Sequence, residues 1–362
     1  MNKYLSQNYA FRKASDRANY SSEKKLSDYL KNPNLHFVFF AIAMCVVAYL
    51  SVTKVLPYSL QTGLAITFSY AISSIGFCLL MGYSGLASLG TGGFIGIGTY
   101  AVYYIMGESG LSLGIAVLVS LGVAILIGII VGFISLRIEG IYLVILTLGL
   151  SEILRNLYMV IEDSISVSSI KIFGMTLRRQ DSMYLIVIVL SLIMIVTNNL
   201  INSPTGRAML AMKNSTAAAQ AMGISLIKYR LMAFVICTAY SSLTGVMLMV
   251  CIRTAMASNG TGFYALITSL NILAAVIIGG FKSIWGAVFG TYIMYGIQTT
   301  LLNQIPFFQK NPEIITFISG GLVIIVVMFY PGGLAQLLTE LKGKLKGLKA
   351  RIKEGIYGKD LG

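Results

Sequence analysis

The chain has 362 residues, of which 56% are hydrophobic and only 11% are charged, and its mean hydropathy is +0.81. Soluble domains carry about 25% charged residues, so the composition excludes a soluble globular protein and predicts an all-α, polytopic membrane protein. The net charge of +14 comes mainly from three polar segments, which hold 18 of the 27 Lys and Arg residues; this placement is typical of cytoplasmic segments beside anionic lipid and not of a nucleic-acid interface.

Apolar runs long enough to cross a bilayer, which takes about 20 residues, recur along most of the chain. We expect about ten transmembrane helices, over residues 35–53, 60–80, 84–106, 111–136, 139–160, 183–201, 231–252, 263–280, 284–302 and 314–330. Ten crossings place both termini and the segment 202–230 on the same side. All of these polar segments are basic, so the positive-inside rule makes that side cytoplasmic.

This topology divides the chain into a basic cytoplasmic N-terminal segment (1–34), a transmembrane domain (35–330) and a basic cytoplasmic tail (331–362). Within the domain, 202–230 is the main cytoplasmic loop and 161–182 is the longest extracytoplasmic segment. In the tail, apolar residues recur every three or four positions among lysines, which is the pattern of an amphipathic helix on the inner leaflet. A solvated basic tail is the alternative.

The segment 82-GYSGLASLGTGGFIGIGTY-100 concentrates glycine in an otherwise Leu, Ile and Val-rich chain. If it is one helix, Ser84, Ser88 and Thr91 share a face at i, i+4 and i+7, and Gly85, Gly92 and Gly96 form a neighbouring face. Small residues let transmembrane helices approach closely, and glycine-interrupted helices also line cavities. The glycines therefore indicate helix packing, and the three hydroxyls are candidates for a substrate pathway.

Ionisable and amide side chains inside the predicted spans are few. Glu152 and Arg155 are spaced i, i+3 and can pair on one helix face, as structural partners or as residues of a pathway. Asn271 is the neutral polar member of the run 263–280, where interhelical hydrogen bonding or a place on the pathway are the two interpretations. These three residues complete the set of pathway candidates.

The loop 202–230 contains a turn with Pro204 and Gly206, an Ala-rich stretch predicted to be helical over 207–222, and Gly223 as its stop. Because alanine side chains are small, this helix surface fits a groove on another protein. We expect the docking residues to be Arg207, Lys213, Ala218, Ala219 and Gly223; a helix with a purely structural role is the alternative.

The sequence contains no Walker A loop, no H-E-x-x-H motif and no carboxylate pair with a neighbouring histidine. We therefore expect no catalytic residues, no metal site and no cofactor bound by this chain. Its four cysteines lack C-x-x-C spacing and favour buried structural thiols.

Five segments together resemble the LivM-type permease of branched-chain amino acid ABC transporters. They are 82-GYSGLASLGTGGFIGIGTY-100, 135-SLRIEGIYLVILTLGLSEILRN-156, 206-GRAMLAMKNSTAAAQAMGIS-225, 278-IGGFKSIWGAVFG-290 and 330-YPGGL-334, in the family's order. The resemblance implies a permease subunit of an importer in the bacterial cytoplasmic membrane, driven by alternating access.

The same resemblance implies the partners. They are a second permease, either a LivH-like homologue or a copy of this chain, two cytoplasmic subunits that bind ATP, and an extracytoplasmic substrate-binding protein. It also implies that 206–225 docks on an ATPase. The chain departs from the family's pattern at Leu86 and Thr91, where we expect any change of substrate, and its docking segment has Asn214, Ser215, Thr216 and Gln220 where the family usually has several acids.

Urea, amides or another small solute remain alternative substrates at this stage. A stand-alone channel or secondary carrier is the alternative from a different class, and it predicts flux without ATP. A membrane enzyme is disfavoured because no catalytic cluster is present in the sequence.

Overall fold

The computed structural model describes residues 33–52, 57–135, 140–172, 175–258 and 263–300, together with scattered residues between 305 and 333. The described part is mainly helical. Its longer helices are α3 (Pro33–Val52), α4 (Tyr58–Leu79), α6 (Leu113–Ser135), α7 (Ile141–Ile161), α8 (Ser182–Asn202) and α11 (Leu226–Ile252). Shorter helices are α5 (Thr91–Val102), α9 (Pro204–Asn214), α10 (Thr216–Ala221), α12 (Leu266–Gly279), α13 (Ile284–Thr291) and α14 (Ile297–Thr300).

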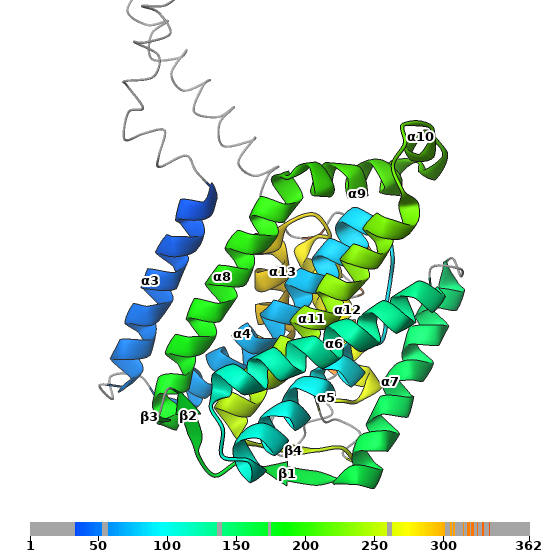
Figure 1. The fold of residues 1–362 in the computed structure, drawn as a ribbon. Coiled ribbons are helices and arrows are strands. Elements are labelled where there is room, and N and C mark those ends of the chain that lie inside the picture. Colours follow the sequence, from blue (N-terminus) through cyan, green and yellow to red (C-terminus); the bar gives the residue numbers. More distant parts are fainter. Residues whose placement is uncertain are drawn as a thin grey trace, which may run out of the picture.

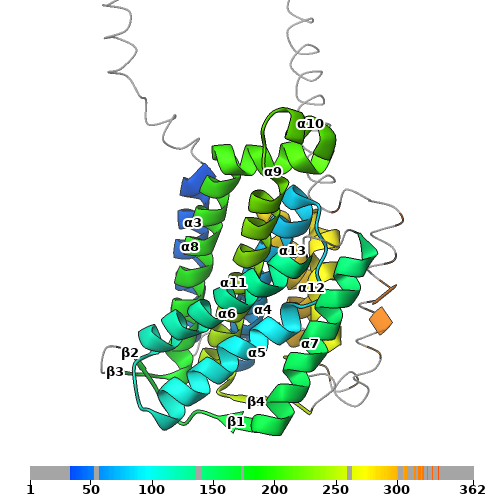
Figure 2. The same ribbon diagram turned by 45° about the vertical axis from the view of Figure 1, so that its right-hand side comes forward.

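Helices α4 and α11 form the centre of the bundle (Figures 1 and 2), and α11 packs on α4, α5 and α6. In the most apolar window of α4, 89% of the residues are buried, and in α11 83%, against 22% in α6 and in α7. Helices that are apolar all round yet largely exposed need lipid or another apolar protein surface around them. The peripheral helices α6 and α7 therefore define the outer surface of a membrane protein.

Short strands close one end of the bundle (Figure 1), whereas α9 and α10 cover the opposite end. β1 (Ser164–Ser166) pairs antiparallel with β4 (Thr254–Met256), and β2 (Ile170–Ile172) pairs antiparallel with β3 (Met175–Leu177). Arg253 stabilises the end of the bundle that holds the strands, because its guanidinium donates to the carbonyl oxygens of Ser168 and Leu177 at 3.2 and 2.7 Å. The segment 161–182 thus contributes β1, which pairs with the distant β4, and the adjacent antiparallel pair of β2 and β3.

Helix α5 begins part-way along the bundle. After α4 the chain makes a π-helical turn, η1 (Leu80–Ser84), and leaves the helical conformation until Thr91. The start of α5 lies beside the middle of α7, because the amide of Gly93 donates to Ser151 Oγ at 2.9 Å. The predicted continuous helix over 84–106 is therefore wrong: Gly85 adopts φ +75 and ends η1, and the next helix begins only at Thr91, where α5 starts, and continues through the π-helical turn Tyr103–Glu108.

Helix α12 also starts inside the bundle, next to the start of α5. A Cβ on Gly92 would lie 3.0 Å from the carbonyl oxygen of Tyr264 and 3.1 Å from that of Ala265, which N-caps α12. From there α12 runs to a turn at 280–283 that lies against the end of η1, since Tyr83 donates its hydroxyl to the Lys282 carbonyl at 3.2 Å. The N-termini of α5 and α12 thus meet in the interior.

Most of the predicted spans coincide with helices. Five described helices are long and apolar enough to cross a membrane, and α3 and α12 contribute shorter apolar stretches. The run 284–302 is divided into α13, a π-helical turn η4 (Tyr292–Gly296) and α14. The run 314–330 and the segments 1–32 and 334–362 lie largely or wholly outside the described residues, so the count of ten and the nature of the tail remain predictions.

Candidate functional site

Hydroxyl side chains satisfy the backbone amides at the start of α5. Gly92 N donates to Ser269 Oγ at 2.9 Å and Gly93 N to Ser151 Oγ at 2.9 Å. Just before the helix, Leu89 N donates to Thr147 Oγ1 at 3.0 Å and Gly90 N to Ser88 Oγ at 3.2 Å. The first amides of a helix have no partner within it, and no water reaches them inside a membrane. Hydroxyls from α7 and α12 therefore hold this interior helix end.

Aromatic side chains surround the same helix. Tyr158 stacks on Tyr100 with ring centroids 4.6 Å apart and donates its hydroxyl to the Gly93 carbonyl at 2.9 Å. Tyr264 lies 5.4 Å from the Tyr158 ring, and its hydroxyl is 2.8 Å from Thr99 Oγ1. Every tyrosine hydroxyl in this group has a polar neighbour, so the cluster orders α5, α7 and the start of α12 as one unit.

The structure separates the three hydroxyls that the helical pattern places on one face. Ser84 ends η1, Ser88 lies in the non-helical segment, and Thr91 is the first residue of α5. The shared face is therefore a wrong prediction, because 85–90 is not helical. Ser84 and Thr91 are 4% and 2% exposed, and neither hydroxyl has a hydrogen-bond partner within the described structure.

The packing role predicted for glycine holds at two of the three positions. Gly92 lies against the start of α12, and a Cβ on Gly96 would lie only 2.1 Å from Cε2 of the Tyr158 ring. Gly85 does not pack between helices: its left-handed backbone ends η1, and its nearest neighbour is the side chain of Lys213. Sequence spacing could not show this, because it assumed one helix throughout.

Glu152 and Arg155 form the pair that their spacing predicts, with Nη1 and Oε2 3.0 Å apart. Arg155 Nε also donates to the Ala257 carbonyl at 3.2 Å, and this links α7 to the segment after β4. Both side chains are partly exposed, at 21% and 32%, so the ion pair itself contributes little stability. Asn271 lies on α12 one turn after Thr268, whose carbonyl accepts from the Tyr295 hydroxyl at 3.3 Å; this bond connects α12 to η4.

The segment 204–221 forms two helices where the sequence predicts one over 207–222. Ser203 caps α9, accepting from Gly206 N at 3.4 Å with Pro204 at the first position, and extended Ser215 separates α9 from α10, accepting from Ala218 N at 3.3 Å. A serine that bonds the following amides favours a helix start over helix continuation. The corrected element is therefore a bent pair of helices.

Gly223 ends α10 as predicted. Its φ is +78, its N–H donates to the Gln220 carbonyl at 2.9 Å, and Ile224 N donates to the Ala219 carbonyl at 3.0 Å. This is the Schellman arrangement, which needs a left-handed residue at this position. Ala218 is exposed, whereas Ala219 is 3% exposed and faces inward, so only part of the predicted alanine surface is open to a partner.

Lys213 is directed toward the bundle. Its Nζ donates to the carbonyl oxygens of Met81 at 3.0 Å and Gly82 at 2.9 Å, at the end of η1. Partial burial lowers the pKa of Lys213, and the charge of Lys282 lowers it further, against an opposing effect of Cys78. Lys213 and Arg207 are both exposed, so their part in docking stays a prediction; Arg207 donates to the Asn202 carbonyl at 3.2 Å beside its own helix.

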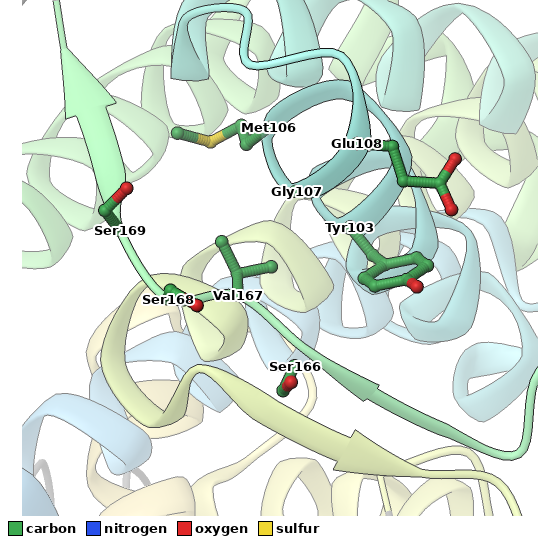
Figure 3. Close-up of a pocket in the computed structure, with 8 residues that line it drawn as sticks. All are labelled: Tyr103, Met106, Gly107, Glu108, Ser166, Val167, Ser168 and Ser169. Atoms are coloured by element: carbon green, nitrogen blue, oxygen red, sulfur yellow. The ribbon is translucent and has the colours of Figure 1, made fainter.

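Two clefts open at opposite ends of the described structure. One of about 180 Å³ lies beneath α9 and α10, lined by Ser84, Gly85, Leu86, Gly140, Met212, Lys213, Thr216 and Arg230. The other, of about 240 Å³, lies at the strand end (Figure 3), between the π-helical turn η2 (Tyr103–Glu108) and the extended segment 166–169. Neither cleft reaches Thr91, the first residue of α5, which is buried in this conformation.

Sequence reasoning missed the hydroxyls that matter most here. Thr147, Ser151 and Ser269 lie among apolar residues of α7 and α12. Thr147, Ser151 and Tyr158 share the buried face of α7 with Leu143 and Leu154. This row of polar and aromatic residues at helical spacing could have been recognised in the sequence. The amides that it binds could not be predicted, because they depend on the helix break before α5.

Five described helices that are long and apolar enough to cross a membrane, together with an interior helix break held by hydroxyls, define a polytopic membrane protein. The chain belongs to the family of permease components of branched-chain amino acid transport systems, whose model matches residues 59–327. This region includes the helices from α4 to α14, and with them the helix break before α5 and the α9–α10 pair.

Two curated relatives are similar to this chain along most of its length. The LivM permease protein of the high-affinity branched-chain amino acid transport system of Salmonella typhimurium is 26% identical over 316 residues, covering 79% of this chain and 72% of the relative. The corresponding LivM protein of Escherichia coli is 26% identical over 317 residues, with the same coverage. No solved structure matches the chain significantly.

Proposed function

We propose that this chain is the transmembrane permease subunit of an ATP-binding-cassette importer for branched-chain, hydrophobic amino acids. The observation that carries the proposal is the family match over 59–327, which spans both the helix break and the α9–α10 pair. The named relatives transport branched-chain amino acids. Because the sequence has no Walker A loop, ATP is bound by partner subunits.

The α9–α10 end is the cytoplasmic end and the ATPase docking site. Positive charge at Arg207, Lys228 and Arg230 supports this orientation through the positive-inside rule, and it makes both termini cytoplasmic. Ala218 and Gly223 are exposed there, and Met222 is 82% exposed, which is unusual for an apolar side chain. A second permease subunit completes the membrane core, and a substrate-binding protein delivers solute at the strand end.

The substrate route passes the starts of α5 and α12. Helices that begin inside the membrane expose backbone groups and helix dipoles to a solute, and α5 and α12 both begin inside the bundle. The buried hydroxyls of Ser84 and Thr91 have no hydrogen-bond partner within the described residues and offer contacts once the bundle opens. Ser88, Asn271, Glu152 and Arg155 are the further pathway candidates, and alternating access opens the route to each side in turn.

Reconstitution tests the proposal directly. The chain is purified with the partner permease, ATPases and binding protein encoded beside it, and labelled leucine uptake into proteoliposomes is measured with and without ATP. We expect ATP-dependent leucine uptake that urea and acetamide do not compete with. An assembled complex that hydrolyses ATP without moving leucine contradicts the amino-acid assignment. Competition by urea supports the amide alternative, and flux through this chain alone without ATP supports a channel or carrier.

Replacing Gly223 with valine is expected to uncouple ATP hydrolysis from uptake. A β-branched residue at φ +78 costs about 1–3 kcal/mol, and it removes the cap that ends α10. The measurement is leucine transported per ATP hydrolysed. Gly223→Asn is the matched control, because asparagine tolerates the left-handed region and should retain coupling. Normal coupling in the valine variant contradicts the docking role of this turn.

A further inference from the structure

At the end of α4, the backbone carbonyls of Met81 and Gly82 accept no backbone N–H among the described residues. In η1 the amides of Gly85 and Leu86 both donate to Leu80 O. The last carbonyls of any helix have no partner within it. Here the Lys213 ammonium supplies the missing donors for Met81 and Gly82, and a cation at a helix C-terminus also interacts favourably with the helix dipole.

The same helix end is tied to the turn before α13. Gly82 lies so close to the Phe281 carbonyl that no Cβ fits between them, and Cys78 Sγ donates to that carbonyl at 3.0 Å. Ser283 in this turn caps α13, accepting from Gly286 N at 3.0 Å. A displacement of η1 therefore carries the start of α13 with it.

Lys213 itself is fixed to the α9–α10 pair. It lies in the last turn of α9, one residue before the Asn214–Ser215 bend. Neighbouring Met209 and Met212 are buried and anchor α9 on the bundle, while the aliphatic stem of Lys213 covers Gly85, with Cγ 3.2 Å from the Cβ position. The Lys213 side chain thus connects the exposed α9–α10 pair to the end of α4, the most buried of the membrane-crossing helices.

We propose that Lys213 is a positioning residue that transmits movement of the α9–α10 pair to the end of α4 and the start of α13. This inference rests on the proposed function, in which the α9–α10 pair follows the ATPases. Lys213 acts through the carbonyls of Met81 and Gly82 and does not contact the solute. Its role differs from docking because it concerns what the bundle does after the ATPases have bound.

The test compares Lys213→Met, Lys213→Arg and Lys228→Met in the reconstituted complex. Methionine keeps an unbranched apolar stem over Gly85 but donates no hydrogen bond, and arginine keeps the charge and the donors. Lys228 is exposed in the first turn of α11 and carries the same charge as Lys213. We expect Lys213→Met to assemble and hydrolyse ATP while leucine uptake per ATP falls by about tenfold, Lys213→Arg to recover most of it, and Lys228→Met to match the unmodified protein.

Hydrogen exchange in the purified permease gives a readout that does not need transport. We expect faster exchange of the amides of residues 83–90 in Lys213→Met than in Lys228→Met, because the end of η1 loses its external partner. Unchanged exchange overturns the proposal even if the complex transports another solute. Unchanged coupling in an active complex also overturns it, whereas failure of leucine uptake in the unmodified protein contradicts the proposed function alone.

Discussion

Replacing Gly98 with alanine is expected to destabilise the bundle strongly at the α5–α11 contact. A Cβ there would lie 1.9 Å from the carbonyl oxygen of Ser242, and a Cβ on the facing Gly245 would lie 1.9 Å from that of Ile95. The obstacle is backbone on both sides, so no side-chain rotation relieves it. Overpacking of this kind costs about 3 kcal/mol, and the apparent Tm of the purified protein in detergent should fall clearly.

Gly122→Ala is the matched control for Gly98→Ala. Gly122 lies on the exposed face of α6, and a Cβ there meets nothing within 4 Å. Alanine is a better helix former than glycine, so this variant should keep or raise the apparent Tm. Equal melting temperatures for the two variants would show that α5 and α11 are not in close backbone contact.

Removing the hydroxyls that hold the start of α5 is expected to have the second largest effect. Ser151→Ala leaves Gly93 N without its acceptor, and Ser269→Ala does the same for Gly92 N. A buried amide without a partner costs about 1–3 kcal/mol, and apolar surroundings offer no water as a replacement. The double variant should lower the apparent Tm more than either single variant does. It should also reduce leucine uptake, because the start of α5 then shifts.

Ser69→Ala is the control for these serine variants. The Ser69 hydroxyl is buried but donates to the Ala65 carbonyl of its own helix at 2.8 Å, so its loss leaves no amide unpaired. We expect little change in the apparent Tm or in uptake. If Ser151→Ala and Ser269→Ala behave like Ser69→Ala, hydroxyl capping does not position α5.

Pattern reasoning succeeded where one helix crosses the bundle without interruption. The runs 111–136, 139–160 and 183–201 coincide with α6, α7 and α8 within a few residues. Their composition alone decides their structure, because a long apolar segment must satisfy its own backbone and a helix does so locally. The Glu152–Arg155 pair and the stop at Gly223 were also predictable, since both depend on neighbours within one turn of the chain.

The same reasoning failed where the partners are distant in sequence. The run 84–106 has the composition of a single helix, yet residues 85–90 are not helical. The Leu89 amide donates to Thr147 of α7, and the amides of Gly92 and Gly93 donate to Ser269 of α12 and Ser151 of α7. Spacing on a helical wheel cannot reveal acceptors that lie 58 or 177 residues away. The contact of Lys213 with the end of η1 was not predictable for the same reason, since its two acceptors are more than 130 residues earlier.

The amino-acid sequence by itself determined that this protein is a helical membrane protein of the permease family, because apolar runs, basic segments and local motifs act over short stretches of chain. Only the tertiary structure decided where α5 and α12 begin, which hydroxyls hold their amides, and that Lys213 faces the bundle. Those features depend on hydrogen bonds between distant segments, and inside an apolar bundle each such bond is required because water cannot replace it.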